Sequence, residues 1–190
     1  MTGRTHDLAA FTALSYVVAT SPVPHISLAT GIVALSANLL GGIAPDIDQP
    51  TAALWQRLPV GSLAGKVVQP LLGGHRYSSH SLIGFWLFGF VLKFVLSHLQ
   101  TVLLVNMDVV WWAFMIGFGS HLIMDTFTRE GVPWLFPIPF RFGIPPLHFL
   151  RIKTGGVVEK SFVFPALLIA NIYIYYRFYR VFLAMLHGLK

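Results

Sequence analysis

The chain contains no cysteine and carries little charge. Only 11% of its 190 residues are Asp, Glu, Lys or Arg, whereas 55% are hydrophobic; soluble domains have about 25% charged residues. This composition predicts an integral membrane protein. Without cysteine there can be no disulfide and no thiolate metal site, so a metal would have to be bound by His, Asp and Glu, which are ligands of catalytic zinc and of manganese.

No polar linker, internal repeat or low-complexity tract divides the sequence, so we expect a single domain over residues 1–190. The apolar segments are 7–21, 25–44, 81–97, 103–125 and 161–182. A membrane span needs roughly 20 mostly apolar residues. These segments predict an all-α membrane bundle with four or five transmembrane helices. The first segment predicts a retained helix rather than a signal peptide, because Pro22 and Pro24 occupy the place of a small-residue cleavage site.

Two long connections, 46–80 and 126–160, are rich in proline and glycine and are predicted to lie on one side of the membrane with the N-terminus. Most basic residues fall on that side: Arg4, Arg57, Lys66, Arg76, Arg129, Arg141, Arg151, Lys153 and Lys160. The other side and the span ends carry Lys93, Arg177, Arg180 and Lys190. This bias predicts that the long connections face the cytoplasm of a bacterial inner membrane. It also explains the net charge of +6 without nucleic-acid binding.

Histidines and aspartates from separate segments gather at the span ends on the same side. They are His6, Asp46 and Asp48 in IAPDID, His75 and His80 in GGHRYSSHSL, and His121 and Asp125 in SHLIMD. His121 and Asp125 are four residues apart and share one helix face. Aspartates at a helix C-terminus oppose the helix dipole, which a bound cation would compensate. We therefore predict that these seven side chains bind one or two divalent ions, zinc or manganese, with Ser78 or Ser79 capping the next helix.

A set of ordered motifs resembles the YdjM-like family of inner-membrane proteins. The motifs are PDID (45–48) with Pro50, QRL (56–58), GHR (74–76), HSL (80–82), SHxxxD (120–125), TxxGVP (128–133) and LFP (135–137). The resemblance covers about 6–160 and leaves out the predicted C-terminal helix 161–182. The family is described as membrane-bound metal-dependent hydrolases and as LexA-binding. It is distantly similar to zinc-dependent phospholipase C, whose zinc ligands include a His-x-x-x-Asp pair like His121 and Asp125.

Together, the residues and the resemblance predict a membrane-bound hydrolase that cleaves a phosphoester, which we expect to be lipid-linked, through a metal-activated water. Arg76 and Arg141 are the predicted phosphate contacts, because guanidinium binds phosphate oxygens in pairs. Glu159 is the predicted general base or an additional ligand. The alternatives are a metal-ion transporter and a non-catalytic regulator that recruits a soluble partner such as a LexA-type repressor.

Overall fold

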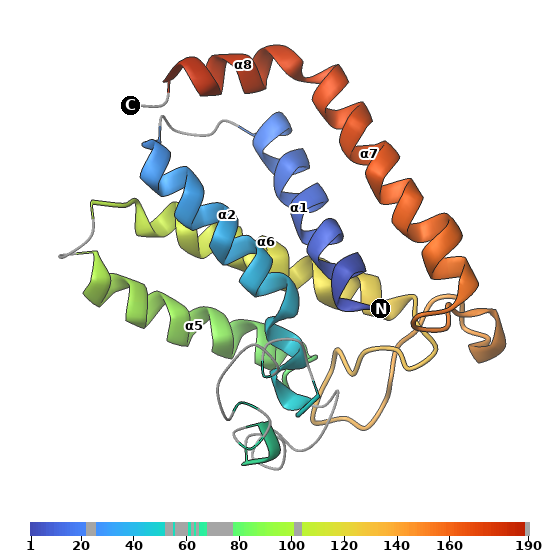
Figure 1. Ribbon diagram of the computed structural model, residues 1–190. Helices are drawn as coiled ribbons and strands as arrows, with labels where there is room; N and C mark the ends of the chain where they lie inside the picture. The colour runs from blue at the N-terminus through green and yellow to red at the C-terminus, as the bar shows by residue number, and fades with distance from the viewer. Residues whose placement is uncertain are drawn as a thin grey trace.

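The computed structural model describes residues 1–21, 26–51, 55, 61, 63, 65–67, 78–100 and 104–188. The main helices are α1 (Gly3–Thr20), α2 (Leu28–Ile43), α5 (Leu82–Leu99), α6 (Met107–Thr126), α7 (Phe164–Arg177) and α8 (Tyr179–Gly188). Three short turns of helix complete the list: η1 (Ala44–Asp48), η2 (His148–Leu150) and η3 (Glu159–Val163). Within the described ranges the chain has no β-strand, and the predicted all-α bundle is confirmed (Figure 1).

Three helical segments are long and apolar enough to cross a membrane: Leu28–Asp48, Leu82–Leu99 and Met107–Thr126. A fourth is possible if Glu159–Arg177 and Tyr179–Gly188 count as one span, although the two parts meet at 72°. The predicted first helix forms as α1, but among the described residues it does not qualify as a candidate span. The last predicted segment, 161–182, is broken after Phe178 by a bend for which the sequence offers no proline or glycine.

The centre of the bundle is the contact between α2 and α6, where glycines let the backbones approach. A methyl group on Gly41 would lie 2.2 Å from the Phe114 carbonyl oxygen, and one on Gly117 would lie 2.1 Å from that of Asn38. The Asn38 side-chain amide donates a hydrogen bond to the Ala113 carbonyl across this contact. Small residues at helix contacts are the usual way in which membrane helices pack closely.

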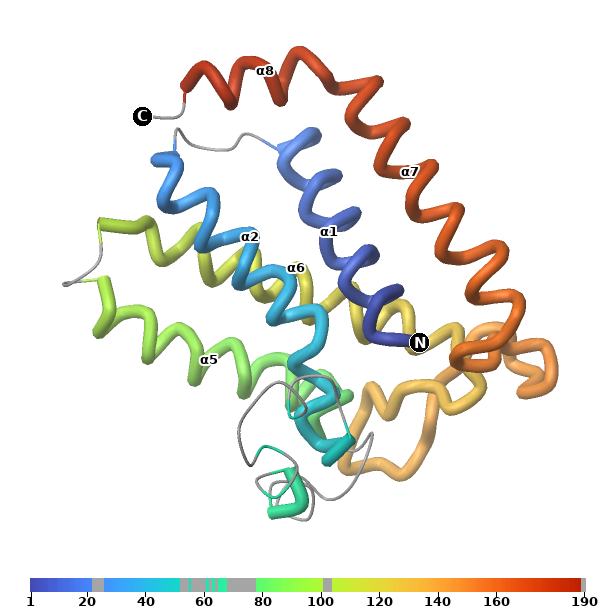
Figure 2. The backbone as a smooth tube through the Cα atoms, in the orientation of Figure 1, coloured from blue at the N-terminus to red at the C-terminus, as the bar shows by residue number. Residues whose placement is uncertain are grey.

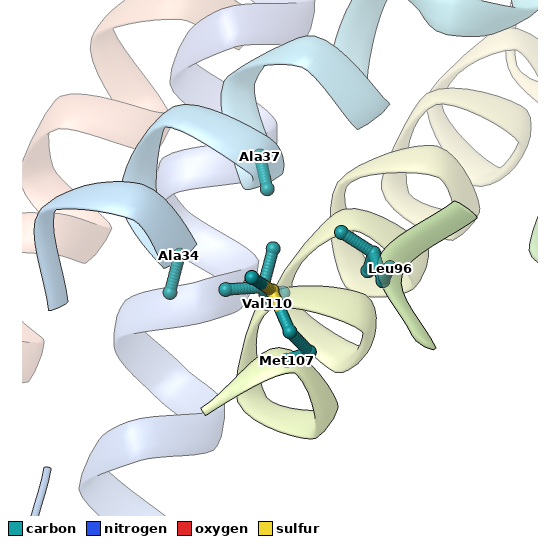
Figure 3. Packing of buried hydrophobic residues seen from close by; sticks show 6 residues of the cluster. Ala34, Ala37, Leu96, Met107 and Val110 are labelled. Atoms are coloured by element: carbon teal, nitrogen blue, oxygen red, sulfur yellow. The ribbon is translucent and has the colours of Figure 1, made fainter. Parts of the chain in front are cut away.

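Around the first turn of α6, a buried cluster of aliphatic side chains joins α2 and α6 to α5. Figure 3 shows Ala34 and Ala37 on α2 facing Met107 and Val110 on α6, with Leu96 of α5 on the other side. α5 is otherwise the least buried of the candidate spans, as expected of a helix that faces lipid. The apolar cluster therefore lies at the end of the bundle opposite the polar residues described below.

Polar contacts attach α7 to α1. The Asn171 amide donates to Thr12 Oγ1 at 2.6 Å, and the Tyr175 hydroxyl lies 3.3 Å from Ser15 Oγ. Figure 2 shows α7 running alongside α1 and α8 turning across the far end of the bundle. The N-terminus, η1, the start of α5 and the end of α6 lie together at the opposite end (Figure 1).

Apart from the short η2, the segment between α6 and η3 is ordered by backbone pairing. Val132 and Phe142 exchange two backbone hydrogen bonds, and Ile152 pairs with Phe127 and Arg129. The Arg151 guanidinium adds hydrogen bonds to the carbonyls of Pro145 and Pro146 at 2.8 and 3.0 Å. This long connection therefore forms a fixed structure at the same end of the bundle as η1 (Figure 2).

Candidate metal centre

Four chain segments deliver histidine and aspartate side chains to one buried cluster at this end. His6 comes from the first turns of α1, Asp46 from η1, His80 from the residue pair before α5, and His121 and Asp125 from α6. Asp46 is 22% exposed, whereas the other four side chains are at most 1% exposed. The structure thus brings together five of the seven predicted ligands.

Short distances link two histidine nitrogens of this cluster to two aspartate oxygens. Asp46 Oδ1 lies 3.5 Å from His80 Nε2 and 3.6 Å from His121 Nε2. Asp125 Oδ2 lies 3.6 Å from His121 Nε2 and 3.9 Å from His80 Nε2. Zinc bonds of 2.0–2.1 Å give a tetrahedron with edges of about 3.4 Å. The four histidine–aspartate distances are close to this value, and the donor atoms of Asp46, His80 and His121 all lie within 4.8 Å of one another, so these three side chains could share one ion.

The His121 ring is fixed with one nitrogen directed at the cluster. Its Nδ1 lies 2.7 Å from the Gly42 carbonyl oxygen, which can only accept, so Nδ1 carries the hydrogen. Nε2 is then the lone-pair nitrogen, and it is buried without a hydrogen-bond partner. This tautomer is the one that binds metals through Nε2, with the other nitrogen oriented by a carbonyl.

His80 is oriented in the same manner by Asp48. Its Nδ1 lies 3.2 Å from Asp48 Oδ2 and 3.1 Å from Ser79 Oγ, and the Ser79 hydroxyl also donates to Asp48. Burial lowers the pKa of His80, but hydrogen bonds to Asp46 and Asp48 outweigh it and raise the pKa above its ordinary value. Asp48 thus lies behind the His80 ring, as a carboxylate that positions the histidine.

His6 belongs to a second, overlapping group with His121 and Asp125. Its ring stacks on that of His121 with centroids 3.7 Å apart, and its Nε2 lies 3.3 Å from Asp125 Oδ1. The Met1 amino group donates to the same oxygen. Both groups, His6–His121–Asp125 and Asp46–His80–His121, depend on His121. Since only Nε2 of His121 is available, the two groups cannot both bind an ion with a full set of three ligands.

The remaining predicted residues lie elsewhere. Glu159 is buried, but its carboxylate accepts hydrogen bonds from Thr2, Thr5 and Gly155 and belongs to neither group. It holds the first turn of α1 and so positions His6 indirectly. Arg141 is exposed on the segment that precedes η2. His75 and Arg76 lie outside the described residues.

Several contacts of the site were not predicted from the sequence. The cap of α5 is Ser81, whose hydroxyl accepts from the Gly84 amide at 3.0 Å, and not Ser78 or Ser79. Ser79 instead binds Asp48. The Gly42 carbonyl that orients His121 carries no signal in the sequence, because any residue supplies a carbonyl. The glycine itself is needed, since a methyl group there would lie 2.9 Å from the Ala10 methyl.

The fold and the cluster define an all-helical integral membrane protein with a candidate metal centre at one end of its spans. The chain belongs to the YdjM inner membrane protein family, whose family model matches residues 1–184. It is 32% identical to the uncharacterized protein YvsG of Bacillus subtilis, over 93% of this chain and 95% of that protein. It is 29% identical to the inner membrane protein YdjM of Escherichia coli, over 71% of this chain and 63% of that protein. No solved structure matches.

Proposed function

We propose that this protein is a metal-dependent hydrolase of the inner membrane that cleaves phosphoesters. The observation that carries the proposal is the set of short donor-atom distances, 3.5 to 3.9 Å, that link the side chains of Asp46, His80, His121 and Asp125. Ionisable groups buried this closely at the end of membrane spans are costly unless they compensate one another or bind a cation. Imidazole and carboxylate together suit zinc, with manganese as the second choice.

A divalent ion bound there would supply an activated water and a positive charge for the phosphoryl oxygens. The protein contributes the orientation of the ligands, because Gly42 and Asp48 fix the rings of His121 and His80 before any ion binds. Asp46 is the only partly exposed member of the four, so the open side of the centre lies at η1. The reacting phosphoester would approach past this short helix.

Asp125 offers one oxygen to each side of the cluster. Its Oδ2 faces His80 and His121, whereas its Oδ1 faces His6. His6 and Asp125 are therefore the side chains that would be available to hold a second ion, with His121 belonging to the first group. This arrangement supports one complete centre and at most one further, incomplete one.

The position of the centre bears on the substrate and on the side of the membrane. The cluster lies at the ends of the candidate spans Leu28–Asp48 and Met107–Thr126, which is where lipid headgroups are. A phosphoester in a lipid or a lipid-linked molecule could reach it without leaving the membrane. The bias of basic residues towards this end supports a cytoplasmic site.

The test compares two identical substitutions at opposite ends of α6. Asp125→Asn keeps the size of the side chain but removes the charge that a cation needs, whereas Asp108→Asn changes an exposed residue that pairs with Lys93. Purified wild-type protein and the Asp108→Asn variant should contain zinc and hydrolyse bis-p-nitrophenyl phosphate, p-nitrophenyl phosphate or phosphatidic acid. Asp125→Asn should lose both properties and should also melt at a lower temperature than Asp108→Asn, because the buried Met1 amino group and His6 lose the carboxylate that they contact. Zinc content and activity are therefore compared at a temperature at which both variants are folded.

Two outcomes would count against the proposal. Zinc-loaded wild-type protein that hydrolyses none of the three substrates would remove the hydrolase assignment. An Asp125→Asn variant with full zinc content and full activity would instead show that the metal is bound somewhere else.

A further inference from the structure

A separate cavity lies beside the candidate metal centre, between the first turn of α1 and the start of α7. Its volume is about 620 Å³, and its lining includes Arg4, Asp7, Ile43, Lys160 and Phe164. Cavities of roughly 300–1,000 Å³ are typical of sites for small molecules and cofactors. The space is thus large enough for a phosphate group together with the part of the molecule that carries it.

The charged lining favours an anion. Arg4 and Lys160 are both exposed, and neither side chain forms an ion pair with any residue in the described part of the chain. Among the described residues that line the cavity, Asp7 is the one acidic side chain, so their net charge is +1. Arginine and lysine contribute charge-assisted hydrogen bonds to phosphate oxygens, which are about twice as strong as neutral ones.

Several residues that line the cavity are sequence neighbours of residues that form or support the candidate metal centre. Its lining residue Thr5 precedes His6 in α1, and Ile43 follows Gly42, whose carbonyl orients His121. Lys160 follows Glu159, the carboxylate that accepts hydrogen bonds from Thr2 and Thr5. The walls of the cavity and the supports of the centre are therefore the same stretches of chain.

The apolar part of the lining indicates what kind of molecule carries the anion. Ile43 and Phe164 belong to α2 and to the start of α7, and Phe164 opens a helix whose Leu168, Ile169 and Ile172 are exposed along its length. Such a surface is suited to the membrane interior. The cavity thus joins a basic pocket at headgroup level to an apolar helix face.

We propose that this cavity is an anion subsite that anchors a phosphate-bearing, amphiphilic substrate beside the metal centre, with Arg4 and Lys160 as its cationic contacts. That the bound molecule is a substrate rests on the proposed function, but its binding in the cavity does not require the metal. Binding energy from a part of the substrate remote from the reacting group is a common way to position that group.

The experiment measures binding to chelator-treated, metal-free protein in detergent. The probes are dioleoyl phosphatidic acid and glycerol 1-phosphate, which share a phosphate monoester and differ in the acyl chains. The variant is Arg4→Gln/Lys160→Gln, and the matched control is Arg129→Gln/Lys153→Gln, an exposed pair on the connection between α6 and η3. The cavity variant should bind phosphatidic acid at least about tenfold more weakly than the wild type, because it loses both cationic side chains that form charge-assisted hydrogen bonds with the phosphate.

The two probes separate a lipid source from a soluble one. Tighter binding of phosphatidic acid than of glycerol 1-phosphate by the wild type supports an amphiphilic substrate, whereas equal wild-type affinities support a phosphate subsite but remove the amphiphilic part of the proposal. Equal affinity of the cavity variant and the control for both probes overturns the inference. Hydrolysis with an unchanged KM in the cavity variant would also overturn the anion subsite but would leave the proposed function standing. Binding of the probes without any hydrolysis by the zinc-loaded wild type would overturn the proposed function but would leave the anion subsite standing.

Discussion

Asp48→Asn separates a carboxylate that positions a histidine from one that binds the metal. In the structure the buried Asp48 carboxylate contacts His80 Nδ1 and accepts from Ser79, while Nε2 on the other side of the ring faces Asp46 and Asp125. Replacing a carboxylate behind a metal-bound histidine typically lowers metal affinity 10- to 100-fold. This corresponds to about 1.4–2.8 kcal/mol of binding free energy.

The matched substitution is Asp46→Asn, which removes the charge of a predicted direct ligand. We expect Asp46→Asn to weaken zinc binding more than Asp48→Asn does, because an amide replaces a charged oxygen that faces two imidazoles at 3.5 and 3.6 Å. Competition with a chromophoric chelator measures both affinities, and thermal unfolding in detergent shows whether each variant is folded. If Asp48→Asn removes zinc as completely as Asp46→Asn, then Asp48 is a ligand and the positioning role is wrong.

Two further predictions concern packing and orientation. Gly117→Ala should lower the stability of the bundle by about 1–3 kcal/mol, because the new methyl group would lie 2.1 Å from the Asn38 carbonyl oxygen, whereas Gly119→Ala, with its nearest contact at 3.6 Å, should be tolerated. Denaturation in mixed micelles compares the pair, and equal stability would show that α2 and α6 can separate at no cost. The chain has no cysteine of its own, so single cysteines can report orientation. In spheroplasts, Lys153→Cys should be protected from a membrane-impermeant maleimide, whereas Gln100→Cys should react. The opposite pattern would place the candidate metal centre outside the cytoplasm.

The sequence was sufficient to predict the helices and their shared polar end. Apolar segments 25–44, 81–97 and 103–125 correspond within a few residues to α2, α5 and α6, because long apolar runs in a membrane can satisfy their backbone only as helices. The predicted start of the first helix was later than the observed Gly3. The hydrogen bonds that order this turn come from Glu159, about 150 residues away, and no local pattern contains them.

The roles of the two aspartates in PDID could not be assigned from the sequence. Asp46 and Asp48 are two residues apart in a 3-10 helix, where each residue turns the direction by about 120°, so their side chains leave on different faces. Only the position of η1 against His80 decides that Asp46 meets Nε2 and Asp48 meets Nδ1. The role of Glu159 could not be assigned from the sequence either. An acidic residue near the end of a loop is a reasonable candidate for a general base, and only the structure shows that its carboxylate accepts four hydrogen bonds.

The distribution of ionisable residues along the spans bears on the choice between reaction and transport. In the described parts of α2, α5 and α6, ionisable side chains lie at the two ends of the spans. At the end away from the candidate metal centre they are Lys93, His98 and Asp108, and Lys93 pairs with the exposed Asp108. The buried polar residue between the two ends on α2, Asn38, donates its amide hydrogen to a backbone carbonyl and carries no charge. Ion pathways through membranes are normally marked by charged or metal-binding side chains along their length.

We therefore expect the centre to retain its ion and not to pass it on. Protein reconstituted into vesicles that contain a zinc-sensitive dye should take up zinc no faster than empty vesicles, while the same preparation binds zinc in proportion to its amount. Uptake that depends on protein and disappears in Asp125→Asn would instead identify the cluster as the entrance of a pathway. Uptake that persists in Asp125→Asn would indicate leakage, because that variant lacks the carboxylate that faces His6, His80 and His121.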